Sequence, residues 1–154
     1  MNSVPLKLEA ALKSYVAANW QGTGEPLNGV TLYRGHTPDE QTTTDKVGFY
    51  AGTVGGPHAQ QGNYEIPVQF IVETSMQKRA GTETEASLLL LHGQRCEAIL
   101  GIFSEARVST VATALMALDT ELGVSAYWPE SQTEEPTDTC LRTVITKVFA
   151  AHLA

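Results

Sequence analysis

The segment Tyr64-Glu-Ile-Pro-Val-Gln-Phe-Ile-Val-Glu-Thr74 decides the fold class of this 154-residue chain. Apolar residues recur at every second position, and most are β-branched or aromatic, which predicts a strand with one buried face. The expected inward-facing residues are Ile66, Val68, Phe70 and Val72. Because Pro67 cannot donate a ladder hydrogen bond, we expect an edge position or a bulge there.

Further strand-like segments lie on both sides of this one. On the N-terminal side, short runs of β-forming residues predict strands at Val30–Arg34 and Val47–Val54. On the C-terminal side we expect a strand at Val124–Trp128, stopped by Pro129, and another at Cys140–His152. The chain therefore predicts a sheet of about five strands.

Three segments have apolar residues at helical spacing. Val4–Trp20 predicts an amphipathic helix laid on the sheet. Ala86–Phe103 predicts the central helix, opened by a capping box at Thr82–Glu85. A shorter helix is expected at Ser109–Leu122, with Gly123 in the position that commonly follows a helix end.

The central helix contains four consecutive leucines, Leu88–Leu91, so we expect it to be covered on more than one face. Arg95 and Glu97 are expected on its solvent side. His92 and Cys96 are four residues apart and can touch, which makes a catalytic Cys–His pair conceivable. No orienting acid stands near them in the sequence, so we favour packing of a buried cysteine.

These elements together predict an α+β fold. The order is one helix, three strands, two helices and two closing strands. We expect a single domain over residues 1–154, with a mostly antiparallel sheet covered by the N-terminal and central helices. No internal repeat, low-complexity tract or linker divides the chain.

Charge and composition exclude several classes of function. The chain has 17 acidic and 10 basic residues, a formal net charge of −7 and an isoelectric point near 5.0. Nonspecific nucleic-acid binding and docking to an anionic membrane are disfavoured, because both need a basic surface. No apolar run approaches the ~20 residues that cross a bilayer, and the N-terminus lacks a signal-peptide pattern. We therefore expect a protein that is soluble and intracellular when it is made.

Motifs that carry chemistry are scarce. Cys96 and Cys140 lie outside any CxxC or metal-binding spacing, so we expect free thiols in a reducing compartment. His36, Asp39 and Glu40 could be considered as metal ligands, but they lie in a polar segment that we interpret as hydrated surface. We expect no metal, no cofactor and no catalytic residue.

Two polar segments are the candidate contact sites for other subunits or partners. Gly55–Asn63 is Gly-rich but lacks the lysine and the following helix of a phosphate loop, so we interpret it as a hairpin tip. Its candidate hydrogen-bonding residues are His58, Gln60 and Gln61. The segment Glu130–Asp138 is expected to be a solvated acidic connection. Its candidate contact residues are Glu130, Glu134, Glu135 and Asp138.

The order of these elements resembles that of tail terminator proteins of long-tailed bacteriophages, also called tail completion or minor tail proteins. The features that carry the resemblance are a short leading helix, a long hairpin ending in Tyr64–Thr74, the helix Ala86–Phe103, and a closing hairpin of Val124–Trp128 and Thr139–Phe149 around an acidic turn. The predicted helix Ser109–Leu122 and the long segment Gly35–Lys46 depart from a minimal member of this family.

The resemblance implies a structural virion protein without catalysis or a cofactor. Such proteins assemble in the host cytoplasm into a homo-hexameric ring on the head-proximal end of the tail tube, where they stop tube growth. The implied partners are other copies of the chain, the tail tube protein, and a head connector or neck protein. An acidic lining would let DNA pass through the ring without specific binding, because like charges repel. No membrane is implied.

Three alternatives stay open. A neck or head–tail joining protein, or the equivalent ring component of a contractile injection system, would share the ring assembly and differ in its context. A small α+β enzyme would need titratable groups that the fold brings together, for instance an acid with His58, His92 or His152.

Overall fold

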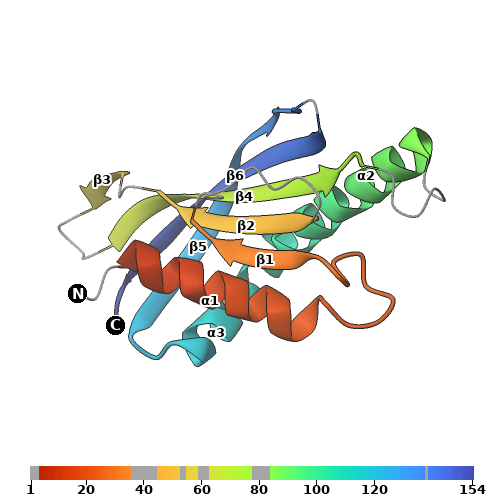
Figure 1. Cartoon of the computed structure of the whole chain (residues 1–154). Coiled ribbons are helices and arrows are strands. Elements are labelled where there is room, and N and C mark those ends of the chain that lie inside the picture. Colours follow the sequence, from red (N-terminus) through yellow and green to blue (C-terminus); the bar gives the residue numbers. More distant parts are fainter. Residues whose placement is uncertain (1–3, 36–44, 53–54, 59–62, 78–83, 138) are drawn as a thin grey trace.

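A mixed, mostly antiparallel sheet is the centre of the molecule (Figure 1). The computed structural model describes residues 4–35, 45–52, 55–58, 63–77, 84–137 and 139–154. The strands stand in the spatial order β1 (Thr31–Arg34), β2 (Lys46–Ala51), β4 (Asn63–Ser75), β6 (Cys140–Leu153) and β5 (Leu122–Glu134), and β3 (Gly55–His58) pairs with β4 beside this path. Neighbours are antiparallel except β1 and β2, which are parallel. The predicted sheet is confirmed.

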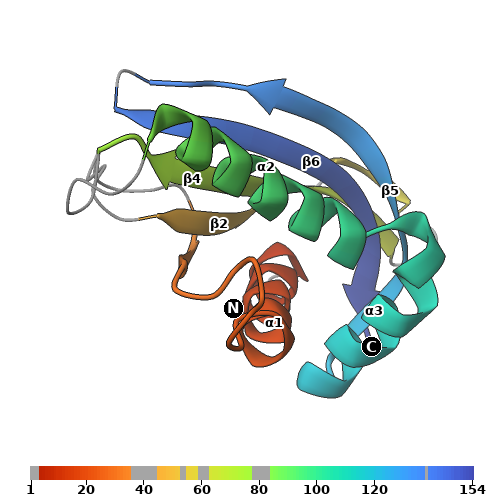
Figure 2. The same ribbon diagram turned by 90° about the vertical axis from the view of Figure 1, so that its right-hand side faces the viewer.

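Helices pack against one face of this sheet (Figure 2). They are α1 (Val4–Asn19), α2 (Glu85–Ile102) and α3 (Val108–Leu118), and a 3₁₀ turn, η1 (Glu105–Arg107), joins α2 to α3. The residues predicted to face inward from β4 are fully buried beneath them. The predicted α+β architecture, with the N-terminal and central helices on the sheet, is therefore confirmed.

Aromatic rings from several elements form the centre of the core. Phe70 of β4 stacks on Phe103, the residue after α2, with ring centroids 4.6 Å apart. Phe149 of β6 and Tyr127 of β5 pack beside them, with centroids 5.0 Å apart. Such ring pairs stabilise the fold beyond the area that they bury. The cluster ties the end of α2 to three strands.

Pro67 lies in a central strand, so the prediction of an edge position or a bulge is wrong. β4 pairs with β6 on one side and with β2 and then β3 on the other. The Pro67 carbonyl accepts a hydrogen bond from Gly52 N at 2.8 Å, just past the end of the β2 ladder. The nitrogen of the same residue faces the same side. The N–H that proline lacks would therefore face Gly52, so the missing donor falls where the β2 ladder ends and does not interrupt it.

The central helix differs from its prediction in its cap and its exposed face. The N-cap is Thr84, two residues beyond the predicted one, and its hydroxyl accepts from Ser87 N at 3.1 Å while Ser87 Oγ accepts from Thr84 N at 3.0 Å. Leu88 is buried, but Leu89 and Leu90 are 50% and 65% exposed. The prediction that the leucine run is covered on more than one face is wrong.

Arg95 is buried, so the prediction that it lies on the solvent side of α2 is wrong, whereas Glu97 is exposed as predicted. Arg95 Nη1 donates to the buried Asp45 carboxylate at 2.6 Å. Asp45 immediately precedes β2, and its carboxylate also accepts from Ser75 N at 3.0 Å. The partner that allows this arginine to be buried is 50 residues away in the sequence.

The predicted helix Ser109–Leu122 is too long at its C-terminal end. α3 ends at Leu118, while Leu122 and Gly123 already belong to β5. Gly123 is opposite His152 of β6, and a Cβ on Gly123 would collide with the His152 ring. This glycine therefore permits close approach of a side chain across the hairpin and does not follow a helix end.

Pro129 does not stop β5, which continues to Glu134. The pairing with β6 shifts between Pro129 and Ser131, and β5 pairs along one side only within the described sheet. An edge strand with a bulge tolerates proline, because an N–H on the open side is not needed. The predicted acidic connection at residues 130–138 is therefore largely strand, and only residues 135–139 connect β5 to β6.

Candidate functional site

The outer half of β5 is exposed on both faces of the sheet. Every residue from Trp128 to Glu134 is exposed, although the first half of the same strand is mostly buried. Glu130 and Glu134 lie in the strand, and Glu135 follows it, with its N–H donating to Arg142 O at 2.8 Å. The prediction that these acids are solvated is confirmed, and Asp138 lies outside the described residues.

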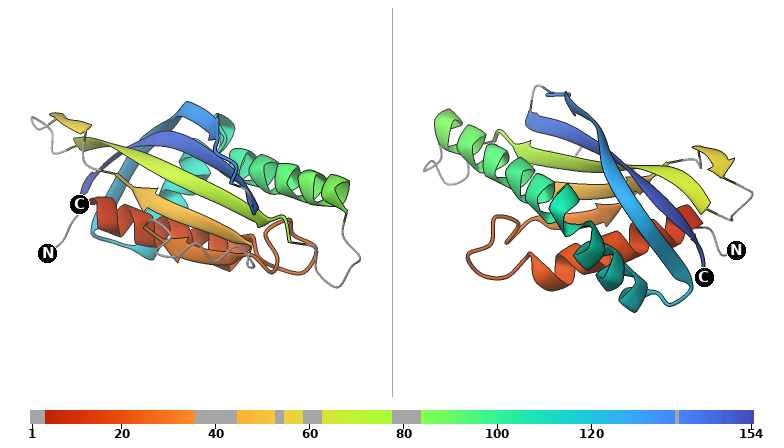
Figure 3. Two further views of the ribbon diagram at one scale, coloured as in Figure 1. Left: turned by 45° about the horizontal axis from the view of Figure 1, so that its top comes forward. Right: turned by 180° about the vertical axis from the view of Figure 1, so that it is seen from behind.

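The second predicted contact segment lies elsewhere on the molecule. Gly55–His58 is strand β3, paired with the start of β4, so the prediction that the whole segment 55–63 is a turn is wrong. Gln60 and Gln61 lie outside the described residues, as does the segment with His36, Asp39 and Glu40. Figures 1 and 3 place β3 and the β5–β6 turn far apart. The strand that carries His58 therefore lies apart from the turn that follows Glu134.

The irregular pairing at Pro129–Ser131 creates two grooves, one on each face of the sheet. Both grooves are lined in part by Glu130, Ser131 and Thr146. An extra residue in one strand bends it and redirects the side chains beside the bulge. The bulge therefore sets the shape of the surface on both sides of the hairpin.

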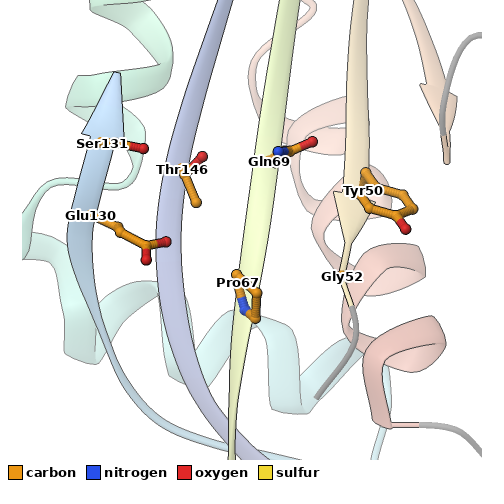
Figure 4. A pocket seen from close by; sticks show the side chains of 7 residues that line it. All are labelled: Tyr50, Gly52, Pro67, Gln69, Glu130, Ser131 and Thr146. Atoms are coloured by element: carbon orange, nitrogen blue, oxygen red, sulfur yellow. The ribbon is translucent and has the colours of Figure 1, made fainter. Parts of the chain in front are cut away.

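The groove on the face opposite the helices has a volume of about 400 Å³ and crosses four strands (Figure 4). Its lining residues are Tyr50, Gly52, Pro67, Gln69, Glu130, Ser131 and Thr146. The strand register places four of these in one row, because Tyr50 pairs with Gln69, Gln69 with Thr146, and Thr146 with Ser131. In Figure 4 the Glu130 carboxylate points from β5 toward the middle of this groove.

Several polar groups in this groove have unused hydrogen-bonding capacity. Thr146 is only 9% exposed, and its side chain makes no hydrogen bond among the described residues, but its hydroxyl oxygen is open to the groove. The side chains of Gln69, Glu130 and Ser131 also lack a protein partner within the described part of the chain. Polar groups that face a groove without a protein partner can bind water or a ligand, so this groove is a candidate binding site.

The groove on the helix side is smaller, about 250 Å³, and contains a buried amine. Lys147 is 4% exposed and stands opposite Pro129 in the register. Burial lowers the pKa of Lys147 below its ordinary value of 10.5, although the charge of Glu105 opposes this shift. Leu100 of α2 and Ile145 form apolar walls.

A chain of hydrogen bonds leads from β5 into the core beneath α2. The Thr143 hydroxyl donates to Glu134 Oε2 at 2.6 Å and lies 2.8 Å from His92 Nε2. His92 Nδ1 lies 2.9 Å from the Thr74 hydroxyl. Arg95 Nη1 donates to that same hydroxyl at 3.1 Å and continues the chain to Asp45.

The directions of these bonds assign the protons of His92. Thr74 accepts from Arg95, so its own hydrogen can donate to Nδ1. Thr143 donates to Glu134, so it accepts from Nε2–H. These directions place a proton on Nε2, and burial, which lowers the pKa of His92, favours the neutral form with Nδ1 as acceptor. The arrangement holds the imidazole in one orientation between α2 and two strands.

Cys96 Sγ lies 3.7 Å from His92 Nε2, so the prediction that these side chains touch is confirmed. The expectation that no acid lies near them is wrong, because Glu134 is connected through Thr143. Burial nevertheless raises the pKa of the Cys96 thiol and lowers that of His92. An activated cysteine needs the opposite shifts, toward thiolate and imidazolium. The pKa shifts of His92 and Cys96 are therefore those of polar side chains packed in the core.

Cys96 and Cys140 are both free, as predicted, and both are buried, which was predicted for Cys96 alone. Among the residues that the structure describes, no three His, Cys, Asp or Glu side chains are grouped so as to hold a metal ion. Taken singly, none of the described helices is long and apolar enough to cross a membrane; α2 and the helical segment after it pass that test only as a pair bent by 44°.

Sequence reasoning identified Glu130 but missed the row of Tyr50, Gln69, Ser131 and Thr146. Each is an outward-facing residue of a strand and gave no motif, because the row exists only through the register of four strands. The signal that the sequence offered was weak: Tyr50 and Gln69 alternate with buried residues along β2 and β4, so they had to face away from the core. No known protein family matches this chain, and no curated protein is significantly similar to it in sequence.

Proposed function

We propose that this chain is a structural subunit that assembles into a ring, caps the head-proximal end of a phage-type tail tube and joins it to the head connector. The observation that carries the proposal is that the sheet ends in two unlike edges. β5 is a 13-residue antiparallel edge strand, whereas β1 at the other edge has four residues and pairs in parallel. A head-to-tail ring needs two different patches on every subunit, and these edges provide them.

The element order supports the same proposal. A leading helix, a long hairpin, a central helix and a closing β5–β6 hairpin follow one another along the chain. This is the order on which the resemblance to tail terminator proteins rests, with α3 added between α2 and β5. The resemblance concerns only the order of the helices and strands. It is the reason for placing the proposed ring on a phage-type tail tube.

The chemistry of the core favours a structural protein over a small enzyme. The His92–Cys96 pair has pKa shifts opposite to those of an activated nucleophile and its base. Both of the nitrogens of His92 contact threonine hydroxyls that are themselves bonded elsewhere. A general base needs a nitrogen that can reach substrate.

The outer half of β5 supports contacts through side chains more than continuation of the sheet. Pro129, the bulge beside it and the charge of Glu130 are features that discourage a second strand from pairing with an edge. A neighbouring subunit would therefore meet the side chains of β5. In this proposal the acidic residues of β5 lie toward the channel of the ring, where they repel DNA and let it pass.

The mass of the purified protein in solution, measured by light scattering with and without tail tubes, tests the proposal. We expect particles of six times the 16.6 kDa subunit mass, formed either alone or on tube ends. Tubes capped by the protein should also stop binding further tube subunits. A protein that stays monomeric at all concentrations and leaves tube growth unchanged would contradict the proposal.

A further inference from the structure

The groove opposite the helices presents hydrogen-bond acceptors around one end. The Glu130 carboxylate and the hydroxyls of Ser131 and Thr146 gather there (Figure 4). None of these three side chains has a protein hydrogen-bond or ion-pair partner within the described residues; Glu130 and Ser131 are exposed, and the hydroxyl of the mostly buried Thr146 is open to the groove. A ligand that donates several hydrogen bonds from one atom would satisfy all three.

The charge of the lining residues restricts which class of ligand this groove can bind. Glu130 is the one ionised residue in the lining, and no cation is among the lining residues. An anion such as a phosphate or an acidic peptide would meet an unpaired carboxylate in this groove and be repelled. A primary ammonium has one positive charge and three donors, which matches one carboxylate and two hydroxyls.

The other end of the groove is suited to an aliphatic stem. The Pro67 ring lies on its floor beside Gly52, and a Cβ on Gly52 would come within 3.3 Å of the Pro67 carbonyl. The strands are therefore close together here, and the floor is flat. Tyr50 forms the far wall (Figure 4). Methylene groups pack well on proline and aromatic rings, and lysine side chains commonly lie along such surfaces.

We propose that this groove binds the side chain of a lysine carried on an extended segment of a partner protein. The ammonium lies among Glu130, Ser131 and Thr146, and the methylene stem lies over Pro67 toward the Tyr50 ring. The groove is open along the sheet surface, so the backbone of the partner remains outside it. The site stands on this chain alone and does not depend on ring formation.

The test is a titration of the ¹⁵N-labelled protein with the peptide acetyl-Gly-Lys-Gly-amide, followed by NMR. We expect saturable shifts of the backbone amides of Gln69, Ser131 and Thr146, with weak affinity because one side chain is bound. The same peptide acetylated on the lysine amine should cause none of these shifts. Acetylation removes the charge and two of the donors while keeping the stem.

Two variants separate a specific site from general attraction to an acidic protein. Glu130→Gln should weaken binding roughly tenfold, because a hydrogen bond to a charged group is lost. Glu135→Gln removes an equally exposed acid five residues along the chain and should leave the affinity unchanged. Both residues are exposed, so both variants should keep the wild-type amide spectrum outside the altered position.

Equal binding of the acetylated peptide, shifts located away from the groove, or equal loss in both variants would overturn the inference. Ring formation, measured separately by light scattering, decides the proposed function. Binding of the lysine peptide by a protein that forms no ring would support this site and reject the ring. Rings that bind no lysine peptide would support the proposed function and reject this site.

Discussion

Arg95 and Asp45 show how strongly one buried pair constrains this fold. Their side chains are 6% and 3% exposed, and Arg95 also contacts Thr74 of the central strand. Replacing Arg95 with methionine keeps much of the apolar stem but removes the guanidinium that contacts the buried Asp45 carboxylate. We expect Arg95→Met to lower the free energy of unfolding by about 3–5 kcal/mol, measured by urea denaturation.

Lys7→Met is the matched control for that substitution. Lys7 pairs with Asp119 at 3.3 Å, but both side chains are partly exposed, so its loss should lower stability by about 1 kcal/mol or less. Adding Asp45→Asn to Arg95→Met should recover part of the loss, because the buried charge that Arg95 contacts is then removed as well. An Arg95→Met variant no less stable than Lys7→Met would contradict this account.

His92 should make the stability of the protein depend on pH. Burial lowers its pKa in the folded state below the ordinary 6.5, and although the charge of Glu134 opposes the shift, that of Arg95 adds to it. The unfolded chain therefore binds a proton at a higher pH than the folded one. The stabilisation by neutral His92 is complete above pH 6.5 and is lost as the pH falls toward the folded pKa.

We expect the unfolding free energy to fall below pH 6.5 by at most about 1.4 kcal/mol per pH unit through this residue. His92→Gln cannot titrate and retains one donor and one acceptor, so its stability should change less over the same range. Urea denaturation at several pH values measures both proteins. Identical pH profiles would show that His92 does not titrate differently in the folded state.

At the scale of the element, α2 contains a glycine that nothing within the described chain requires. Gly93 lies on the exposed face of this helix, and a Cβ there would meet no atom within 4 Å. Glycine inside a helix loses more backbone freedom on folding than alanine does. We expect Gly93→Ala to raise the free energy of unfolding by about 0.5–1 kcal/mol, measured by urea denaturation.

Gly123→Ala is the control at a glycine that the hairpin does require. Its new methyl group would collide with the His152 ring across β5 and β6, so we expect a loss of about 1–3 kcal/mol. If Gly93→Ala raises the free energy of unfolding and Gly123→Ala lowers it, the assigned packing of α2 and of the β5–β6 hairpin is supported. Destabilisation by Gly93→Ala in the isolated protein would mean that the outward face of α2 is not open as described.

At the scale of the whole molecule, the acids of the β5–β6 hairpin should affect assembly more than folding. Glu130 and Glu135 are exposed, so the double change Glu130→Lys with Glu135→Lys should alter subunit stability by no more than about 0.5 kcal/mol. We expect it to change the concentration at which rings form, and to do so more at low salt than at high salt. Light scattering over a salt series measures this effect.

Glu25→Lys with Glu97→Lys is the matched control, because it changes the net charge equally at exposed residues away from the hairpin. If both double variants shift ring formation alike, the effect is one of net charge. If neither does so at any salt concentration, the acidic hairpin is surface without a role in assembly.

The sequence by itself determined where the main strands and helices lie and, for β4 and α1, which side is packed against the core. In β4 the alternation of apolar residues is a local pattern, and burial confirms it at the four residues predicted to face inward, although Ile71 on the other face is buried as well. Leu8 and Leu12 on α1 were predictable for the same reason. Such patterns depend only on the period of one element, so the fold class and the buried stripes needed no knowledge of distant residues. The acids of residues 130–135 were likewise predictable as solvated, because charge alone favours water.

Only the tertiary structure decided where one element meets another. Pro67 fits a central strand because the N–H that it lacks would lie where the β2 ladder ends, and Arg95 is buried because Asp45 reaches it from before β2. The groove row also depends on the register of four strands, and a slip of one residue would send its side chains to the opposite face. These outcomes follow from contacts between residues far apart in the sequence. The free energy of such contacts depends on all partners at once, so no short stretch of sequence predicts it.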